Sequence, residues 1–370
     1  MPRNKRLHFK DLNALRGIAF FPIFLFCTLY YVSYEQNGML KELNVFVEKI
    51  AYNSIDFFFL LSSFLLTSHA LREYKYLEKF SLKNFYIRRI FRIAPVLIIA
   101  LIFTFIFHPW MNEKLALHEI SLPKAEPFLY MLPNYFSGPS NFEFLYLAII
   151  AAVYMFLQFY FVWGIVLKYF NRFIPHIGIG LVLFGLVVRI IHVSRGSDFV
   201  LDTMAYGVPI GVGAFLAYAI RSDLKFIQQL KEVSKNVNTI IYIIGSLFVI
   251  GGYIVTIKHI GTAFIPLITS IFYGYIIIEQ TFGKNSFVKL KNQKLLTHFG
   301  RISYSLIIYQ GIIGFMVMIA FESLEGNLNS PYALLLIFLS AFNGAIIAAN
   351  ISFKIIEKPL LRIRREFKKV

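Results

Sequence analysis

Residues 12–32 read LNALRGIAFFPIFLFCTLYYV, and this stretch determines the fold class. It is apolar over about 20 residues, the length with which an α-helix crosses the hydrocarbon core of a bilayer. Its one charged side chain, Arg16, is costly inside lipid, so it must reach an interface, form a pair or serve a site. Cys27 follows after about three helical turns, so the two side chains share one helical face, about 16 Å apart along the axis. The function therefore depends on what that face contacts.

The composition of the whole chain excludes a soluble fold. Its 370 residues are 58% hydrophobic, 18% aromatic and 15% charged, whereas soluble domains average about 45–50% apolar and about 25% charged residues. The mean hydropathy is +0.65. The single cysteine excludes an internal disulfide. We expect residues 12–32 to be a retained first helix, because no small-residue cleavage site follows them.

The sequence predicts an all-α, polytopic membrane bundle of about ten transmembrane helices. Inside lipid only helices and closed barrels satisfy every backbone polar group, and apolar segments of this length are typical of helices. The expected spans are residues 12–32, 54–71, 93–107, 145–167, 177–191, 203–220, 239–256, 262–282, 302–320 and 332–353.

The distribution of basic residues predicts the orientation of these spans. Of the 37 Lys and Arg residues, 29 lie in segments on the side of the N-terminus and only six in segments on the other side. This asymmetry predicts that both termini are cytoplasmic. The net charge of +17 then reflects topology and contact with anionic membrane lipids, and we expect no nucleic-acid partner.

A basic cluster precedes the third span, in residues 84–95, which read NFYIRRIFRIAP. On a helix, Arg88, Arg89 and Arg92 lie on one side at the cytoplasmic surface. Three guanidinium groups suit a phosphate or pyrophosphate. Arginines next to a membrane also serve as anchors on lipid head groups, so both interpretations stay open.

The second span, residues 54–67, reads SIDFFFLLSSFLLT. Asp56 lies near its outer end, while Ser62 and Ser63 lie near mid-depth. These side chains could form the polar wall of a substrate path. Small hydroxyls in membrane helices more often hydrogen-bond to a neighbouring helix, the interpretation we favour for the serines.

Further polar residues in or near spans need partners. Gln310 is a buried amide in the ninth span. Asp202 is expected to pair with Arg195 or Arg189. His69, at the cytoplasmic end of the second span, could approach Arg16. The sequence contains no metal-ligand spacing, no glycine-rich phosphate loop and no nucleophile elbow.

Taken together, an ordered series of motifs resembles the acyltransferase 3 family of membrane O-acyltransferases. The resemblance implies one integral membrane domain, residues 1–370, in a bacterial inner membrane. It implies transfer of an acyl group, such as acetyl, from a cytoplasmic acyl-CoA-type donor to a hydroxyl of a cell-surface saccharide or glycolipid. The matching segments are LNALRGIAFFPIFLF, IDFFFLLSSFLLT, FYIRRIFRIAP, QFYFVW, LDTMAYGVPIGVGAFLAY, GRISYSLIIYQ and SFKIIEKPLLRIRRE.

The resemblance also assigns site residues. Arg16 matches the family arginine that precedes a histidine by eleven positions, and the Arg88 cluster matches the family's basic donor motif. The histidine positions are occupied by Cys27 and Gln310, and the carboxylate usual before Gln158 is missing. General-base help is worth about 10²–10⁴ in rate.

These departures leave two functional hypotheses. The first is an acyltransferase whose candidate catalytic residues are Arg16, Cys27, Gln310 and Asp56, with no metal. Cys27 could serve as a nucleophile, although a packing role is the default for a thiol in lipid. The second is a non-catalytic relative that carries or flips a lipid or glycan, or supports a glycan-assembly complex. The oligomeric state is not predicted.

Overall fold

The computed structural model describes residues 10–33, 39–115, 124–136, 144–255, 260–286, 289–323 and 331–363. Within these ranges the chain is helical and contains no strand. Ten helices in them have the length and apolar composition needed to cross a membrane, the number predicted. The all-α membrane fold class is therefore confirmed.

Successive helices are joined by short turns in the described ranges. The membrane-spanning elements are α1 (Lys10–Ser33), α2 (Met39–Leu77), α3 (Leu82–Ile102), α7 (Leu145–Tyr169), α8 (Ile174–Arg195), α9 (Gly207–Arg221), α11 (Lys235–Val255), α12 (Ile265–Phe282), α13 (Lys294–Ser323) and α14 (Pro331–Ser352). The shorter elements are η1 (Phe103–Phe107), α4 (His108–Leu115), α5 (Glu126–Leu129), α6 (Pro133–Phe136), η3 (Asn171–Phe173), η4 (Thr203–Tyr206), α10 (Lys225–Lys231), η5 (Ile260–Phe264), η6 (Leu290–Asn292), η7 (Phe353–Glu357) and α15 (Lys358–Ile363).

Two helices extend well beyond the predicted spans. α2 has 39 residues, about 58 Å of helix at 1.5 Å per residue, whereas the hydrocarbon core is about 30 Å thick. Its first four turns carry Lys41, Glu42, Glu48 and Lys49, so hydropathy alone misses them. α3 begins at Leu82, where the Ser81 side chain accepts a hydrogen bond from a backbone N–H of the first turn.

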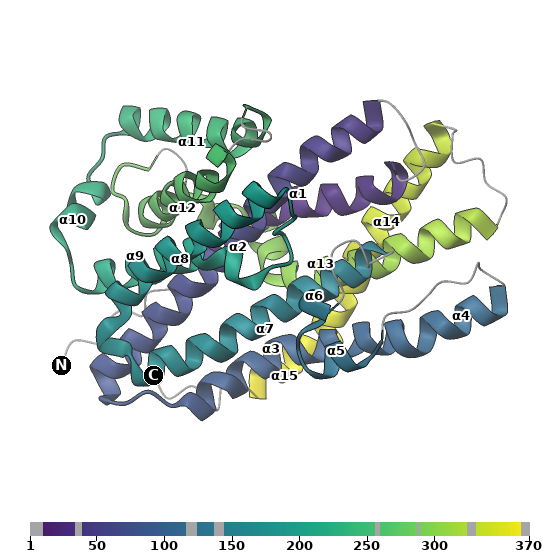
Figure 1. Ribbon diagram of the computed structural model, residues 1–370, viewed down its shortest axis with the longest axis horizontal. Helices are drawn as coiled ribbons and strands as arrows, with labels where there is room; N and C mark the ends of the chain where they lie inside the picture. The colour runs from purple at the N-terminus through teal and green to yellow at the C-terminus, as the bar shows by residue number, and fades with distance from the viewer. Residues whose placement is uncertain are drawn as a thin grey trace.

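α1 and α2 occupy the centre of the bundle (Figure 1). α1 packs against α13 and α2, α2 packs against α9, α9 packs against α8, and α13 packs against α14. One hydrophobic cluster joins α2 to α3, α7 and α13, and a second joins α1 and α2 to α9 and α12. The first helix is therefore held on several sides.

α1 and α13 approach so closely that only glycine fits at their contact. A Cβ built on Gly300 would lie 1.7 Å from the Asn13 carbonyl oxygen, and one on Gly17 would lie 2.3 Å from the Leu296 carbonyl oxygen. Small residues allow such approaches between membrane helices. This contact fixes the position of the turn of α1 that carries Arg16.

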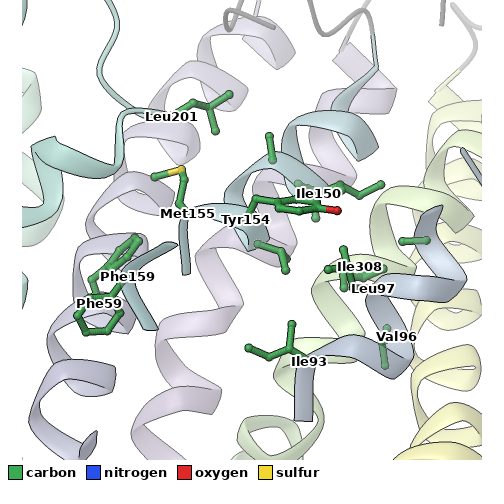
Figure 2. Packing of buried hydrophobic residues seen from close by; sticks show 14 of the residues in the cluster. Phe59, Ile93, Val96, Leu97, Ile150, Tyr154, Met155, Phe159, Leu201 and Ile308 are labelled. Atoms are coloured by element: carbon green, nitrogen blue, oxygen red, sulfur yellow. The ribbon is translucent and has the colours of Figure 1, made fainter. Parts of the chain in front are cut away.

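The largest hydrophobic cluster lies where α2, α3, α7 and α13 meet. Figure 2 shows Phe59, Ile93, Tyr154 and Ile308 from these four helices around one centre. The Phe59 ring stacks on Phe156, with ring centroids 4.1 Å apart. Ile93 and Phe156 of this packed centre also line the cavity described next.

Candidate functional site

A cavity of about 800 Å³ lies between α1, α2, α3, α7 and α13. Its volume falls within the range of about 300–1,000 Å³ that is typical of ligand pockets. Along α2 the lining extends from Glu48 to Glu73, about 38 Å of helix. Exposed residues occur at both ends, His69 at one and Asp198 at the other. The cavity therefore runs along much of the bundle, and its two ends differ in charge.

One end, which we call the arginine end, is lined by Arg16, Arg88, Arg89 and Arg92. The first comes from α1 and the others from α3, so the fold brings together groups that are far apart in the chain. The charge of Arg16 interacts with those of Arg92 and Arg89, and its Nη1 donates to the Asn13 side chain at 3.3 Å. Because these cations repel one another, an anion bound among them is favourable.

Two of the cluster arginines are held by neighbouring side chains. Arg88 forms an ion pair with Glu73 at 3.4 Å, and Glu73 also accepts a hydrogen bond from the Ser81 backbone N–H at 3.0 Å. The Arg89 guanidinium lies over the Tyr160 ring, 5.8 Å from its centroid. A planar guanidinium can stack on an aromatic ring while it keeps its positive charge. These contacts orient the cluster, and the Glu73 carboxylate offsets the charge of Arg88.

Arg92 interacts with a carboxylate that the sequence analysis missed, Glu357. Glu357 is buried at the end of the π-helical turn η7, which packs against α3. It accepts a hydrogen bond from the Ser352 hydroxyl at 3.5 Å. Single π-helical turns are frequent at functional sites. In the sequence, the only sign that Glu357 could be functional was its position in the last matching family segment, SFKIIEKPLLRIRRE.

Cys27 lines the same cavity as Arg16, so the prediction that they share a helical face is confirmed. The thiol is buried at 1% exposure and belongs to the largest hydrophobic cluster. It lies beyond Arg16 in the direction of the opposite end. Cys27 is therefore part of the cavity wall at the position where the family motif has an imidazole.

Asp56 lies outside the cavity lining, so of the two roles considered for it, the wall of a substrate path is excluded. Its carboxylate accepts a hydrogen bond from Arg189 Nη2 at 2.6 Å, and both side chains are 1% exposed. Arg189 Nε also donates to the Ala205 carbonyl oxygen at 2.7 Å. The predicted pairing of Asp202 with Arg189 or Arg195 was wrong, because Asp202 contacts His192 at 2.9 Å. The packing of α2, α9 and α8 brings Asp56 to Arg189 instead.

Gln310 is also outside the cavity lining. Its side chain is buried, and its Nε2 donates to the Thr28 hydroxyl at 2.7 Å and to the Phe24 carbonyl oxygen. These bonds join α13 to α1, so the prediction that this amide needs partners is confirmed. Gln310 therefore links two helices and does not contact the cavity, which contradicts its prediction as a catalytic candidate.

The two serines of α2 have different environments. Ser63 is buried and donates to the Ile210 carbonyl oxygen at 2.7 Å, the interhelical bond that was favoured for it. Ser62 lines the cavity and accepts a hydrogen bond from the Tyr160 hydroxyl at 3.4 Å.

His69 lines the cavity at the arginine end, as does Arg16. Its Nδ1 lies 2.6 Å from the Leu65 carbonyl oxygen.

At the end opposite the arginines, the lining includes Glu48, Tyr52 and Asp198, which the sequence analysis did not select. Glu48 and Tyr52 are four residues apart, a spacing that brings two side chains together only on a helix. The sequence analysis did not assign this segment to a helix, so it did not predict their contact. Asp198 lies in the connection between α8 and η4. In the part of the chain that the structure describes, no three His, Cys, Asp or Glu side chains are grouped to hold a metal ion.

The fold and the cavity define a class, an integral membrane protein whose helices enclose a chamber that is cationic at one end. The chain belongs to the acyltransferase 3 family, because the family's model, described as an acyltransferase domain, matches residues 9–350. Searches of curated proteins and of solved structures gave no match. The membership supports a membrane acyltransferase-like role.

Proposed function

We propose that this protein is an O-acyltransferase of a bacterial inner membrane. It transfers an acyl group from a cytoplasmic acyl-CoA-type donor to a hydroxyl of a cell-surface saccharide or glycolipid. The observation that carries the proposal is the meeting of Arg16 with Arg88, Arg89 and Arg92 at one end of a cavity that continues past Cys27.

The arginine end suits the phosphates of such a donor. Guanidinium groups bind phosphate oxygens through charge-assisted, often bidentate hydrogen bonds. Two carboxylates interact with this cluster: Glu73 pairs with Arg88, and Glu357 interacts with Arg92. A bound phosphate would also relieve the repulsion between Arg16 and Arg92. The charge of the lining therefore favours entry of an anionic carrier at this end.

The middle of the cavity suits the acyl-bearing arm. Ile23, Phe26 and Phe58 line it together with Cys27, and an apolar wall keeps water away from a reactive thioester. The donor, when bound, supplies a thioester carbonyl carbon that a hydroxyl attacks. An ester C–O bond forms, the C–S bond breaks, and the leaving sulfur takes a proton. The side chains of α1 and α2 hold the two substrates in line for this attack.

The proposal is tested with purified protein in liposomes that receive labelled acetyl-CoA and a saccharide acceptor. Arg16→Ala and Arg89→Ala should each raise the KM for acetyl-CoA about 10–100-fold, since a hydrogen bond to a charged group contributes about 1.5–3 kcal/mol. Arg172→Ala is the matched control, because Arg172 is exposed and does not line the cavity.

A non-catalytic relative that carries a lipid or glycan is the second candidate. It is favoured by Cys27 and Gln310, which stand where the family motifs have imidazoles. Absence of transfer by the wild-type protein, together with equal acetyl-CoA binding in the wild type and both arginine variants, would contradict the enzymatic proposal and favour this candidate.

A further inference from the structure

The end of the cavity opposite the arginines has an acidic and aromatic lining. The Tyr52 hydroxyl donates a hydrogen bond to Glu48, and both side chains are half-buried. The carboxylate of Asp198 interacts electrostatically with Glu48 and with Tyr52. These three groups come from α2 and from the connection after α8, so they form a small cluster only in the folded protein.

We propose that this acidic end binds the hydroxyl-bearing acceptor and that Glu48 accepts the proton of the attacking hydroxyl. The inference rests on the proposed function and adds to it a site and a proton acceptor. The acidic end is part of the same cavity as the arginine end, so an acceptor bound there can meet a donor that enters from the arginines.

The chemistry of the lining selects the class of ligand. Ionised carboxylates are pure acceptors, and a sugar offers several hydroxyl donors to them. The rings of Tyr30 and Tyr52, which also line this region, offer flat apolar surfaces to the C–H faces of a sugar ring. An anion is disfavoured beside Glu48 and Asp198 by charge repulsion. The arginine end therefore favours an anionic donor, and the acidic end favours a neutral acceptor with several hydroxyl groups.

The position of Glu48 also fits a role in proton transfer. Cys27 occupies the wall where the family motif has an imidazole, and a buried thiol is a poor base. Glu48 is a carboxylate on the same cavity, farther from the arginines along α2. A general base of this kind contributes about 10²–10⁴ to the rate.

The step balances without any further reactant. Glu48 takes the proton of the acceptor hydroxyl as its oxygen forms the ester bond to the acyl carbon. The C–S bond of the thioester breaks, and the released thiolate leaves through the arginine end with the rest of the donor and takes a proton from the water outside. Glu48 returns its proton to water at the acidic end, where Asp198 is exposed.

Sugar binding can be measured independently of catalysis. Full-length protein in nanodiscs is mixed with methyl glucoside as the probe, and saturation-transfer NMR reports contact with the sugar protons. We expect a signal from the wild type, from Arg89→Ala and from the control Glu42→Ala, which changes an exposed carboxylate outside the lining. Glu48→Ala should reduce the signal at least fivefold. No signal from the wild type, or an undiminished signal from Glu48→Ala, would overturn the acceptor site.

Transfer of labelled acetyl to methyl glucoside tests the proton acceptor. Glu48→Gln keeps the size of the side chain and should lower kcat at least 100-fold, while the KM for acetyl-CoA stays within twofold. Glu48→Asp should recover part of the rate, which a purely structural role would not predict. Wild-type kcat in Glu48→Gln would overturn the role of Glu48. If the wild type binds the sugar but does not bind acetyl-CoA, the proposed function is refuted, whereas the acceptor site is supported.

Discussion

Asp56 and Arg189 form a fully buried ion pair whose removal should be costly. Asp56→Asn removes the carboxylate that pairs with the Arg189 guanidinium in a site where both side chains are 1% exposed. Breaking such a pair typically destabilises a protein by about 3–5 kcal/mol, since the remaining charge stays buried. The free energy of unfolding in mixed detergent micelles should fall by this amount.

A matched comparison separates this effect from the loss of any carboxylate. Asp202→Asn removes the partner of His192, a pair that is partly exposed, and should cost less than about 1 kcal/mol. The double variant Asp56→Leu with Arg189→Met should recover most of the stability, because no charge remains buried. If Asp56→Asn were as stable as Asp202→Asn, the pair would have no structural role.

Substitutions of Cys27 distinguish a catalytic role of its thiol from a packing role in the cavity wall. We expect Cys27→Ser to keep the rate of acetyl transfer within threefold, because transfer directly to the acceptor hydroxyl does not use the thiol. Cys27→His should raise the rate, because an imidazole is a better base near neutral pH. Steady-state assays with labelled acetyl-CoA measure both. Complete loss of transfer in Cys27→Ser would instead indicate a covalent thioester intermediate.

Residues close in sequence were easier to place than partners from different helices. The shared face of Arg16 and Cys27 follows from their spacing along one helix. The partner of Asp56 lies 133 residues away, and nothing local in the sequence distinguishes Arg189 from Arg195. A charge inside a span can be recognised as costly, but its partner depends on how the helices pack.

The contact between α1 and α13 makes Gly300 sensitive to the smallest substitution. In Gly300→Ala the new Cβ would lie 1.7 Å from the Asn13 carbonyl oxygen, so one helix must move. Overpacking of this kind costs about 1–3 kcal/mol. Because the displaced turn of α1 carries Arg16, the KM for acetyl-CoA should rise as well. Thermal unfolding and transfer kinetics of the purified variant test both effects.

Gly180→Ala in α8 is the matched control for this variant. No atom lies within 4 Å of a Cβ built on Gly180, and alanine is favoured over glycine in a helix by about 1 kcal/mol. The control should therefore be as stable as the wild type or slightly more stable. A Gly300→Ala variant that behaved like this control would show that the two helices can separate without loss.

Element boundaries show where hydropathy succeeds and where it fails. The ten apolar spans were recovered because about 20 apolar residues in a row have few alternatives to a membrane helix. The start of α2 was missed by 15 residues, since its first turns contain Lys and Glu. Glu48 and Tyr52 of the acidic end lie on this missed segment, which is why Glu48 was not considered.

At the scale of the whole molecule, the sequence predicted the arginine end only in part. Spacing grouped Arg88, Arg89 and Arg92, and the family resemblance linked them to Arg16. Their meeting requires α3 and α1 to face one chamber, which depends on the packing of five helices. The cavity itself has no sequence pattern, because its lining alternates between elements far apart in the chain.

The proposed donor entry requires the arginine end to face the cytosol. The Arg221 guanidinium at the end of α9 donates to the Ser68 carbonyl oxygen, so the start of α10 lies at this end. Single cysteines can be placed in a Cys27→Ser background at Lys225 and at Lys124, both of which are exposed. By the positive-inside rule, Lys124→Cys should react with an impermeant maleimide in intact cells, and Lys225→Cys only after permeabilisation. The reverse pattern would place the arginines outside, where no acyl-CoA is available, and would refute the proposed direction of transfer.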